Sequence, residues 1–152
     1  MTLEPGHAAP AFTLETPEGP VSLSDFAGRK LVLWFYPKDD TSGCTSEAKD
    51  FTALVDDFAA IGVAVLDVSK DSIAKHVKFI EKHDLKVQLA SDPDGETLEA
   101  YGVWVEKSMY GRKYMGIERS TFLIGPDGRI LNVWRKVKVP GHAAAVLKAA
   151  QG

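Results

Sequence analysis

A continuous apolar segment, residues 31–36, and a second segment, residues 63–68, that is apolar except for Asp67 bracket a stretch with helical periodicity, and this pattern limits what the chain can form. Apolar runs of this length are typical of strands that are buried on both faces of a sheet. Between the two runs, apolar side chains recur every three or four residues, at Ala48, Phe51, Leu54, Val55, Phe58 and Ala59. The pattern predicts a helix that begins near Cys44 and ends at Gly62, between two buried strands.

The rest of the chain alternates strand and helix signals. The expected elements are a hairpin (11–14 and 21–23), a helical turn (24–28), a helix from a cap at Asp71 or Ser72 to about His83, a strand (87–90), a helix (96–101), a hairpin (120–124 and 130–134) and a closing helix (143–150). Residues 106–118 are predicted to form a loop. We expect a single α/β domain over residues 1–152, with a mixed sheet flanked by helices and an N-terminal β-hairpin.

Composition excludes several classes of function. The net charge is −3 and the pI is about 5.8, which argues against a nucleic-acid partner or an anionic membrane surface. No apolar run approaches the roughly 20 residues of a membrane span, and the N-terminus lacks the pattern of a signal peptide. A single cysteine cannot form an intramolecular disulfide, so we expect a cytoplasmic protein whose thiol stays reduced.

Metal and cofactor signals are weak. The histidines are scattered, and neither CxxC nor HExxH spacing occurs. His76 and His83 lie two helical turns apart, which is too far to share one ion. The chain has neither a GxGxxG nor a Walker A run, so the sequence predicts no metal and no cofactor.

Cys44 is the only cysteine, and it follows a strand that ends at Pro37 and a short polar turn. Unpaired N–H groups at a helix N-terminus favour a thiolate there. A reactive residue between strand and helix also lies where open α/β folds bind ligands. A lone intracellular cysteine is more often a small buried hydrophobe, and position alone leaves both interpretations open.

The spacing Pro37-x-x-x-Thr41-x-x-Cys44 resembles the active-site signature of peroxiredoxins, the thiol peroxidases of the thioredoxin fold. Arg119 matches the distant catalytic arginine of that family. The stretch 35–47 looks most like the Q-type subfamily, also called bacterioferritin comigratory proteins, and the similarity continues to Gly128. The resemblance implies a thioredoxin-like mixed sheet and a peroxidase activity.

The resemblance also implies a role for each matching residue. Cys44 would attack a peroxide and become a sulfenic acid, while the Thr41 hydroxyl and the Arg119 guanidinium would bind the thiolate and the peroxide. Pro37 would shield the thiolate, and Gly43 and Cys44 would offer backbone N–H groups. Taken singly, Thr41 is equally a helix N-cap, Pro37 a strand terminator and Arg119 a surface residue; their combination favours catalysis.

The sequence departs from the Q-type pattern at three positions. Ser42 stands where many members have proline, and Lys49 and Ile80 stand at the two places where members carry a resolving cysteine. The resemblance therefore implies a one-cysteine mechanism, in which thioredoxin, glutaredoxin, glutathione or a similar external thiol attacks the sulfenic acid. Such an enzyme should be exposed to further oxidation. Q-type relatives are monomers or weak homodimers.

Two alternative functions remain open on the sequence. A peroxide sensor would form a mixed disulfide with a partner and turn over slowly. A thioredoxin-fold module without redox function would leave Cys44 with the slow alkylation of an ordinary thiol.

Overall fold

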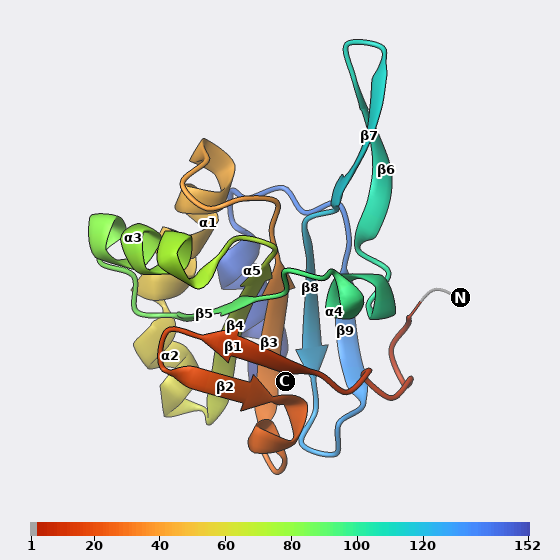
Figure 1. Cartoon of the computed structure of the whole chain (residues 1–152). Coiled ribbons are helices and arrows are strands. Elements are labelled where there is room, and N and C mark those ends of the chain that lie inside the picture. The colour runs from red at the N-terminus through yellow and green to blue at the C-terminus, as the bar shows by residue number, and fades with distance from the viewer. Residues whose placement is uncertain (1–2) are drawn as a thin grey trace.

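The computed structural model describes residues 3–152 and has a mixed seven-stranded sheet at its centre (Figure 1). The strands are β1 (Thr13–Thr16), β2 (Gly19–Ser22), β3 (Lys30–Phe35), β4 (Val63–Ser69), β5 (Gln88–Ser91), β8 (Ser120–Ile124) and β9 (Ile130–Trp134). Their order in the sheet is β2-β1-β5-β4-β3-β8-β9. The β3–β4 and β4–β5 pairs are parallel and the other pairs are antiparallel, which confirms the predicted mixed sheet and N-terminal hairpin.

Helices cover both faces of this sheet, as predicted. They are the 3-10 turn η1 (Leu23–Phe26) and the α-helices α1 (Ser42–Ala53), α2 (Val55–Ala60), α3 (Ile73–His83), α4 (Glu96–Ala100) and α5 (His142–Gln151). One face of β3 packs against α4 and η1, and the other face packs against α1, α2, α3 and α5. No helix within residues 3–152 is long and apolar enough to cross a membrane.

The buried strand β3 determines where Cys44 lies. Every residue of β3 after Lys30 is buried, because β4 and β8 flank it and helices cover its two faces. The chain leaves the sheet after Phe35 and forms a polar loop, and α1 begins at Ser42. Cys44 is therefore in the first turn of a helix at the carboxyl end of a central strand, as the sequence predicts.

The crossover between β3 and β4 differs from the single helix that was predicted. It consists of α1 and α2, which are separated at Leu54, where φ is −103° and ψ is 3°. The Leu54 amide bonds to the carbonyl oxygens of Phe51 and Thr52, which closes the end of α1. Both helices keep their apolar residues on the sheet, and the rings of Phe51 and Phe58 lie 5.9 Å apart. The apolar spacing therefore continues from α1 into α2, and for this reason it does not predict the break at Leu54.

Residues 106–118 are not a loop, and this prediction was wrong. Strands β6 (Trp104–Met109) and β7 (Arg112–Ile117) form a separate antiparallel hairpin that projects from the main sheet (Figure 1). Tyr110 and Gly111 connect them, with φ of 52° and 78°. Two positive φ angles in a two-residue connection are those of a type I′ turn, the preferred hairpin turn. Most of this hairpin is exposed on both faces, so its sequence lacks the apolar alternation that marks a half-buried strand.

Candidate active site

The site is built around Cys44, whose side chain is fully buried in the first turn of α1. Thr41 is the N-cap residue, with extended φ and ψ of −88° and 155°, and its carbonyl oxygen accepts from the Thr45 amide at 2.8 Å. The amides of Ser42, Gly43 and Cys44 have no acceptor inside the helix, because first-turn donors lack one. The sulfur therefore lies beside polar N–H groups that point out of the helix start.

Arg119 directly precedes β8, the antiparallel neighbour of β3, and its side chain contacts this sulfur. Its Nη2 donates to Cys44 Sγ over 3.1 Å. The strand pairing explains the contact, because Ser120 is paired with Phe35 at the end of β3, and Arg119 precedes it directly. The backbone of Arg119 is held by a 3.0 Å bond from the Val137 amide. Burial opposes the charged guanidinium, yet the nearby sulfur and the carboxyl group of Glu47 raise the pKa of Arg119.

Glu47 is a part of the site that the sequence did not predict. It is 1% exposed, and its Oε1 accepts from Arg119 Nη1 at 2.5 Å. Its Oε2 has no hydrogen-bond partner among the described residues. Burial raises the pKa of Glu47 to about 7, against the opposing effect of Arg119. Glu47 lies three residues after Cys44, and this helical spacing, which places both on one face of α1, was the signal that could have found it.

His142, the first residue of α5, lies next to Glu47. Its Nε2 lies 3.9 Å from Glu47 Oε2 and 2.8 Å from Thr121 Oγ1, with which it forms a hydrogen bond. Burial, together with the positive charge of Arg119, lowers the pKa of His142 to about 4. The imidazole is therefore neutral near pH 7, so Arg119 is the cation that both the sulfur and Glu47 contact.

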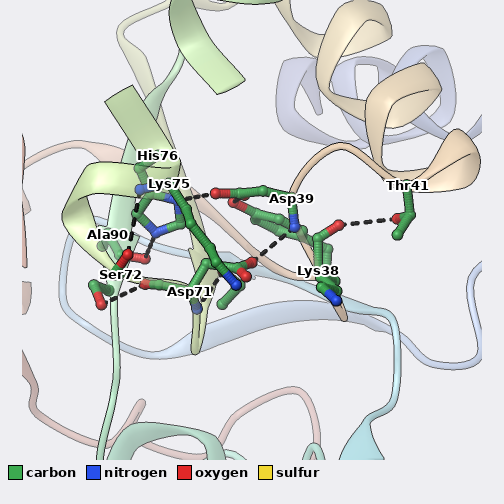
Figure 2. A network of polar contacts seen from close by, with 11 residues as sticks. Lys38, Asp39, Thr41, Asp71, Ser72, Lys75, His76 and Ala90 are labelled. Carbon is green, nitrogen blue, oxygen red and sulfur yellow. Dashed lines mark hydrogen bonds and ion pairs between the residues drawn. The ribbon is translucent and has the colours of Figure 1, made fainter. Parts of the chain in front are cut away.

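The structure brings Gly43, Cys44 and Arg119 together. A Cβ atom at Gly43 would lie 3.2 Å from Arg119 Nη2, so the absence of a side chain lets the guanidinium approach the helix start. The Thr41 hydroxyl donates to the Lys38 carbonyl at 2.9 Å, within its own loop (Figure 2). Pro37 lines a neighbouring cavity of about 340 Å³. The catalytic roles of these residues stay predictions.

A buried polar network holds the loop that leads to Cys44 (Figure 2). The two carboxylate oxygens of Asp39 bond to the Tyr36 hydroxyl at 2.5 Å and to His76 Nδ1 at 2.6 Å. The Asp39 amide donates to Asp71 Oδ2 at 2.7 Å, and His76 Nε2 contacts the Ala90 carbonyl at 2.9 Å. The loop is therefore fixed to α3 and to the ends of β4 and β5. No pattern in the sequence predicts this network.

Within residues 3–152, no group of three or more histidine, cysteine or carboxylate side chains is placed to hold a metal ion. What the arrangement offers instead is a buried sulfur that faces an arginine fork and free amide donors. Such a set stabilises negative charge on the sulfur and on an oxygen that departs from it.

Comparison with known proteins identifies the family. Residues 5–133 match the AhpC/TSA family. A putative peroxiredoxin bcp of Coxiella burnetii is 51% identical over 148 residues, covering 97% of this chain and 98% of that protein. The peroxiredoxin Bcp of Bacillus subtilis is 48% identical over 149 residues, covering 97% of this chain and 95% of its own length.

Solved structures agree. The Xanthomonas campestris bacterioferritin comigratory protein, studied for its alkyl peroxide reduction activity, superimposes with a TM-score of 0.88 at 45% identity, covering 92% of this chain and 90% of that one. A cysteine-to-serine mutant of Xylella fastidiosa PrxQ gives a TM-score of 0.94 at 40% identity, covering 99% and 97%. These matches confirm the thioredoxin-like fold. The chain therefore belongs to the AhpC/TSA family and is a peroxiredoxin of the Bcp, or PrxQ, group, a thiol-dependent peroxidase.

Proposed function

We propose that this protein reduces hydrogen peroxide and organic hydroperoxides through a sulfenic acid at Cys44. The 3.1 Å contact between Arg119 Nη2 and Cys44 Sγ carries the proposal, because it places a permanent cation on the sulfur of the only cysteine. The Cys44 thiolate attacks the terminal peroxide oxygen, a sulfur–oxygen bond forms and the O–O bond breaks. The departing alkoxide takes up one proton and leaves as an alcohol, or as water from hydrogen peroxide.

The difficult part of this step is the negative charge that develops on the departing oxygen. Arg119 and the first-turn amides of Gly43 and Cys44 are donors already aimed at this place, and each such donor is worth about 2–4 kcal/mol in related oxyanion sites. We assign to the Thr41 hydroxyl a bond to the peroxide once it rotates away from the Lys38 carbonyl. Pro37 shields the thiolate from water at the start of the loop.

The second half of the cycle needs a thiol from another molecule, because the chain has one cysteine. An external thiol attacks the sulfenic sulfur, water leaves and a mixed disulfide forms. A second thiol then releases Cys44 and leaves with the oxidised donor. Thioredoxin, glutaredoxin and glutathione are suitable donors in the cytoplasm, where we place this protein as a monomer or weak homodimer. Cys44 is fully buried, so the start of α1 must move before a thiol can reach it.

Peroxide consumption with dithiothreitol as the donor tests this proposal. The wild-type protein should consume hydrogen peroxide and cumene hydroperoxide catalytically, and Cys44→Ser should consume neither. Consumption that persists in Cys44→Ser, or none in the wild type, would overturn it. Slow turnover with a mixed disulfide to a partner that is not a reductant would instead favour a peroxide sensor.

A further inference from the structure

The β6–β7 hairpin carries most of the strongly exposed apolar surface of the described residues. Four of the six large apolar side chains that are exposed belong to it, namely Met109, Tyr110, Tyr114 and Met115. Tyr110, at the tip, is 98% exposed and Met109 is 56% exposed. Large apolar side chains that are exposed to solvent together on one element usually mark a binding surface. The hairpin pairs with no strand of the main sheet, so packing in the core does not explain them.

One face of this hairpin is continuous with the active site. The register pairs Lys107 with Tyr114 and Met109 with Arg112, and strand alternation places these four side chains on the same face, which we call the Lys107 face. A Cβ atom at Gly116 would lie 3.3 Å from both Lys107 Cδ and Tyr114 Cε2, so these two side chains lie across Gly116. Lys107 also lines one cavity together with Arg119, and burial and the charge of Arg119 lower the pKa of its ammonium.

Two cavities next to the site share the Lys107 face as a wall. A cavity of about 430 Å³ is lined by Arg119 and by Lys136 from the segment after β9, and a cavity of about 340 Å³ is lined by Pro37. Lys107 and Tyr114 line both cavities. The hairpin therefore borders the approach to Cys44 from the arginine side and from the loop side.

The charge of this region is opposite to that of the whole chain. The hairpin has three basic residues, Lys107, Arg112 and Lys113, against the single carboxylate of Glu106, and three more basic residues lie in the segment 135–138. The chain as a whole has a net charge of −3. A symmetric contact between two copies through this face would bring like charges together, which disfavours a second copy of the chain as its occupant.

We propose that the Lys107 face and the Tyr110 tip dock the protein that supplies the external thiol. The partner is a dithiol protein whose reactive cysteine lies in an apolar surface with an acidic rim. This inference rests on the proposed function, since a chain with one cysteine needs a thiol from outside. The first partner thiol attacks the Cys44 sulfenic sulfur, water leaves and a mixed disulfide forms. The second partner thiol then attacks the partner's sulfur in this mixed disulfide, which releases the Cys44 thiolate and leaves the partner with an internal disulfide.

The test compares a protein dithiol with a small one. The tip variant is Met109→Ser combined with Tyr110→Asn, because Asn-Gly suits the type I′ turn and should keep the hairpin folded. The matched control is Ile61→Ser, since Ile61 is also exposed, at 41%, but precedes the amino end of β4, whereas Cys44 follows the carboxyl end of the parallel strand β3. Each protein is assayed with reduced thioredoxin, regenerated by its reductase, and with dithiothreitol.

We expect the tip variant to lose about tenfold or more in kcat/KM for thioredoxin, mainly through a higher KM, because truncated aromatic anchors cost this much at interfaces. Arg112→Glu should have a similar effect, and added salt should narrow its difference from the wild type, because salt screens exposed charges. The activity with dithiothreitol should stay unchanged, and Ile61→Ser should match the wild type in both assays.

Several results would overturn the inference. A tip variant that keeps the wild-type kcat/KM for thioredoxin would overturn it, and so would a wild-type protein that turns over with dithiothreitol but not with thioredoxin. A dimer in sedimentation that dissociates in the tip variant would assign the face to a second copy, and binding to anionic phospholipid vesicles that the tip variant loses would assign it to a membrane. No peroxide consumption with either donor would instead refute the proposed function.

Discussion

Arg119 donates from Nη2 to the sulfur of Cys44 over 3.1 Å, although the two residues are 75 positions apart in the chain. The contact follows from the sheet, because β3 delivers Cys44 and its antiparallel neighbour β8 delivers Arg119 to the same edge. The second arm of the guanidinium bonds to Glu47, so that one planar group joins a sulfur and a carboxyl group. This fork gives the site its specific geometry.

Replacing the fork with a single charged amine should slow the reaction with peroxide. Arg119→Lys keeps the charge but cannot reach both Cys44 and Glu47. We expect the peroxide step to slow by about 100-fold, the cost of a lost oxyanion donor. Stopped-flow kinetics measures the step, and urea unfolding of the same variant separates it from misfolding. Arg29→Lys, whose guanidinium lies over the ring of Phe26, is the control and should react as the wild type does. A wild-type rate in Arg119→Lys would contradict the role of the fork.

Glu47 should give the folding stability a pH dependence of known sign. Burial raises its pKa from 4.5 to about 7, so between these values the folded chain holds a proton that the unfolded chain has lost. Stability should therefore fall as the pH rises from about 4.5 to about 7 and level off above, by about 3 kcal/mol in total.

Glu47→Gln removes this titration and keeps an oxygen acceptor for Arg119. Urea unfolding between about pH 5 and 8 should give a flatter stability curve for Glu47→Gln than for the wild type. Asp67 is present in both proteins; burial is the main cause that raises its pKa, and the charge of Glu47 contributes further. Parallel curves would show that Glu47 does not titrate in this range.

The network around Asp39 should stabilise the loop before Cys44. His76→Ala removes the hydrogen-bond partner of Asp39 Oδ2 and the contact to the Ala90 carbonyl, and we expect a loss of about 2–4 kcal/mol together with a slower peroxide step. His83→Ala, on the same helix, removes only the contacts of a more exposed histidine and should change stability much less. Equal effects of the two variants on both measurements would refute the special role of the buried pair.

Asp67 is expected to cost stability. It is fully buried in β4, neither of its carboxyl oxygens has a hydrogen-bond partner among the described residues, and burial raises its pKa well above its usual value. Asp67→Val removes an unsatisfied acid and suits a strand, so unfolding should require about 1–3 kcal/mol more. Asp71→Val is the control. Asp71 accepts hydrogen bonds from Ser69 and from the Asp39 amide, so this variant should be less stable than the wild type. A destabilised Asp67→Val would show that the carboxyl group has a structural role.

The central fold was predictable because burial shapes its sequence. The runs that form β3 and β4 are apolar, apart from Asp67 in β4, because both of their faces are covered, and the helical spacing after Cys44 follows from one covered face. The β6–β7 hairpin was missed for the opposite reason, because neither face packs on the core over most of its length and no alternation results. The break at Leu54 was missed because both helices bury their apolar residues in the same core.

The site was only partly predictable for a related reason. The signature spacing and the resemblance it carries led to Cys44 and Arg119, which the structure places in contact. Glu47 and Asp39 were missed because a carboxylate in the sequence normally indicates the surface, and only the tertiary fold shows that these two are buried. The spacing of His76 from His83 bears only on metal binding, whereas the partners of His76 in the structure are a carboxylate and a backbone carbonyl.

The most direct measurement is anaerobic stopped-flow mixing of the reduced protein with hydrogen peroxide, followed by mass spectrometry of the Cys44 peptide. We expect a rapid reaction, orders of magnitude faster than that of free cysteine, that leaves one added oxygen on Cys44 after one equivalent of peroxide. A rate no faster than free cysteine, or oxygen found on other residues while Cys44 stays reduced, would contradict the claim that Arg119 and the start of α1 form a peroxidatic site.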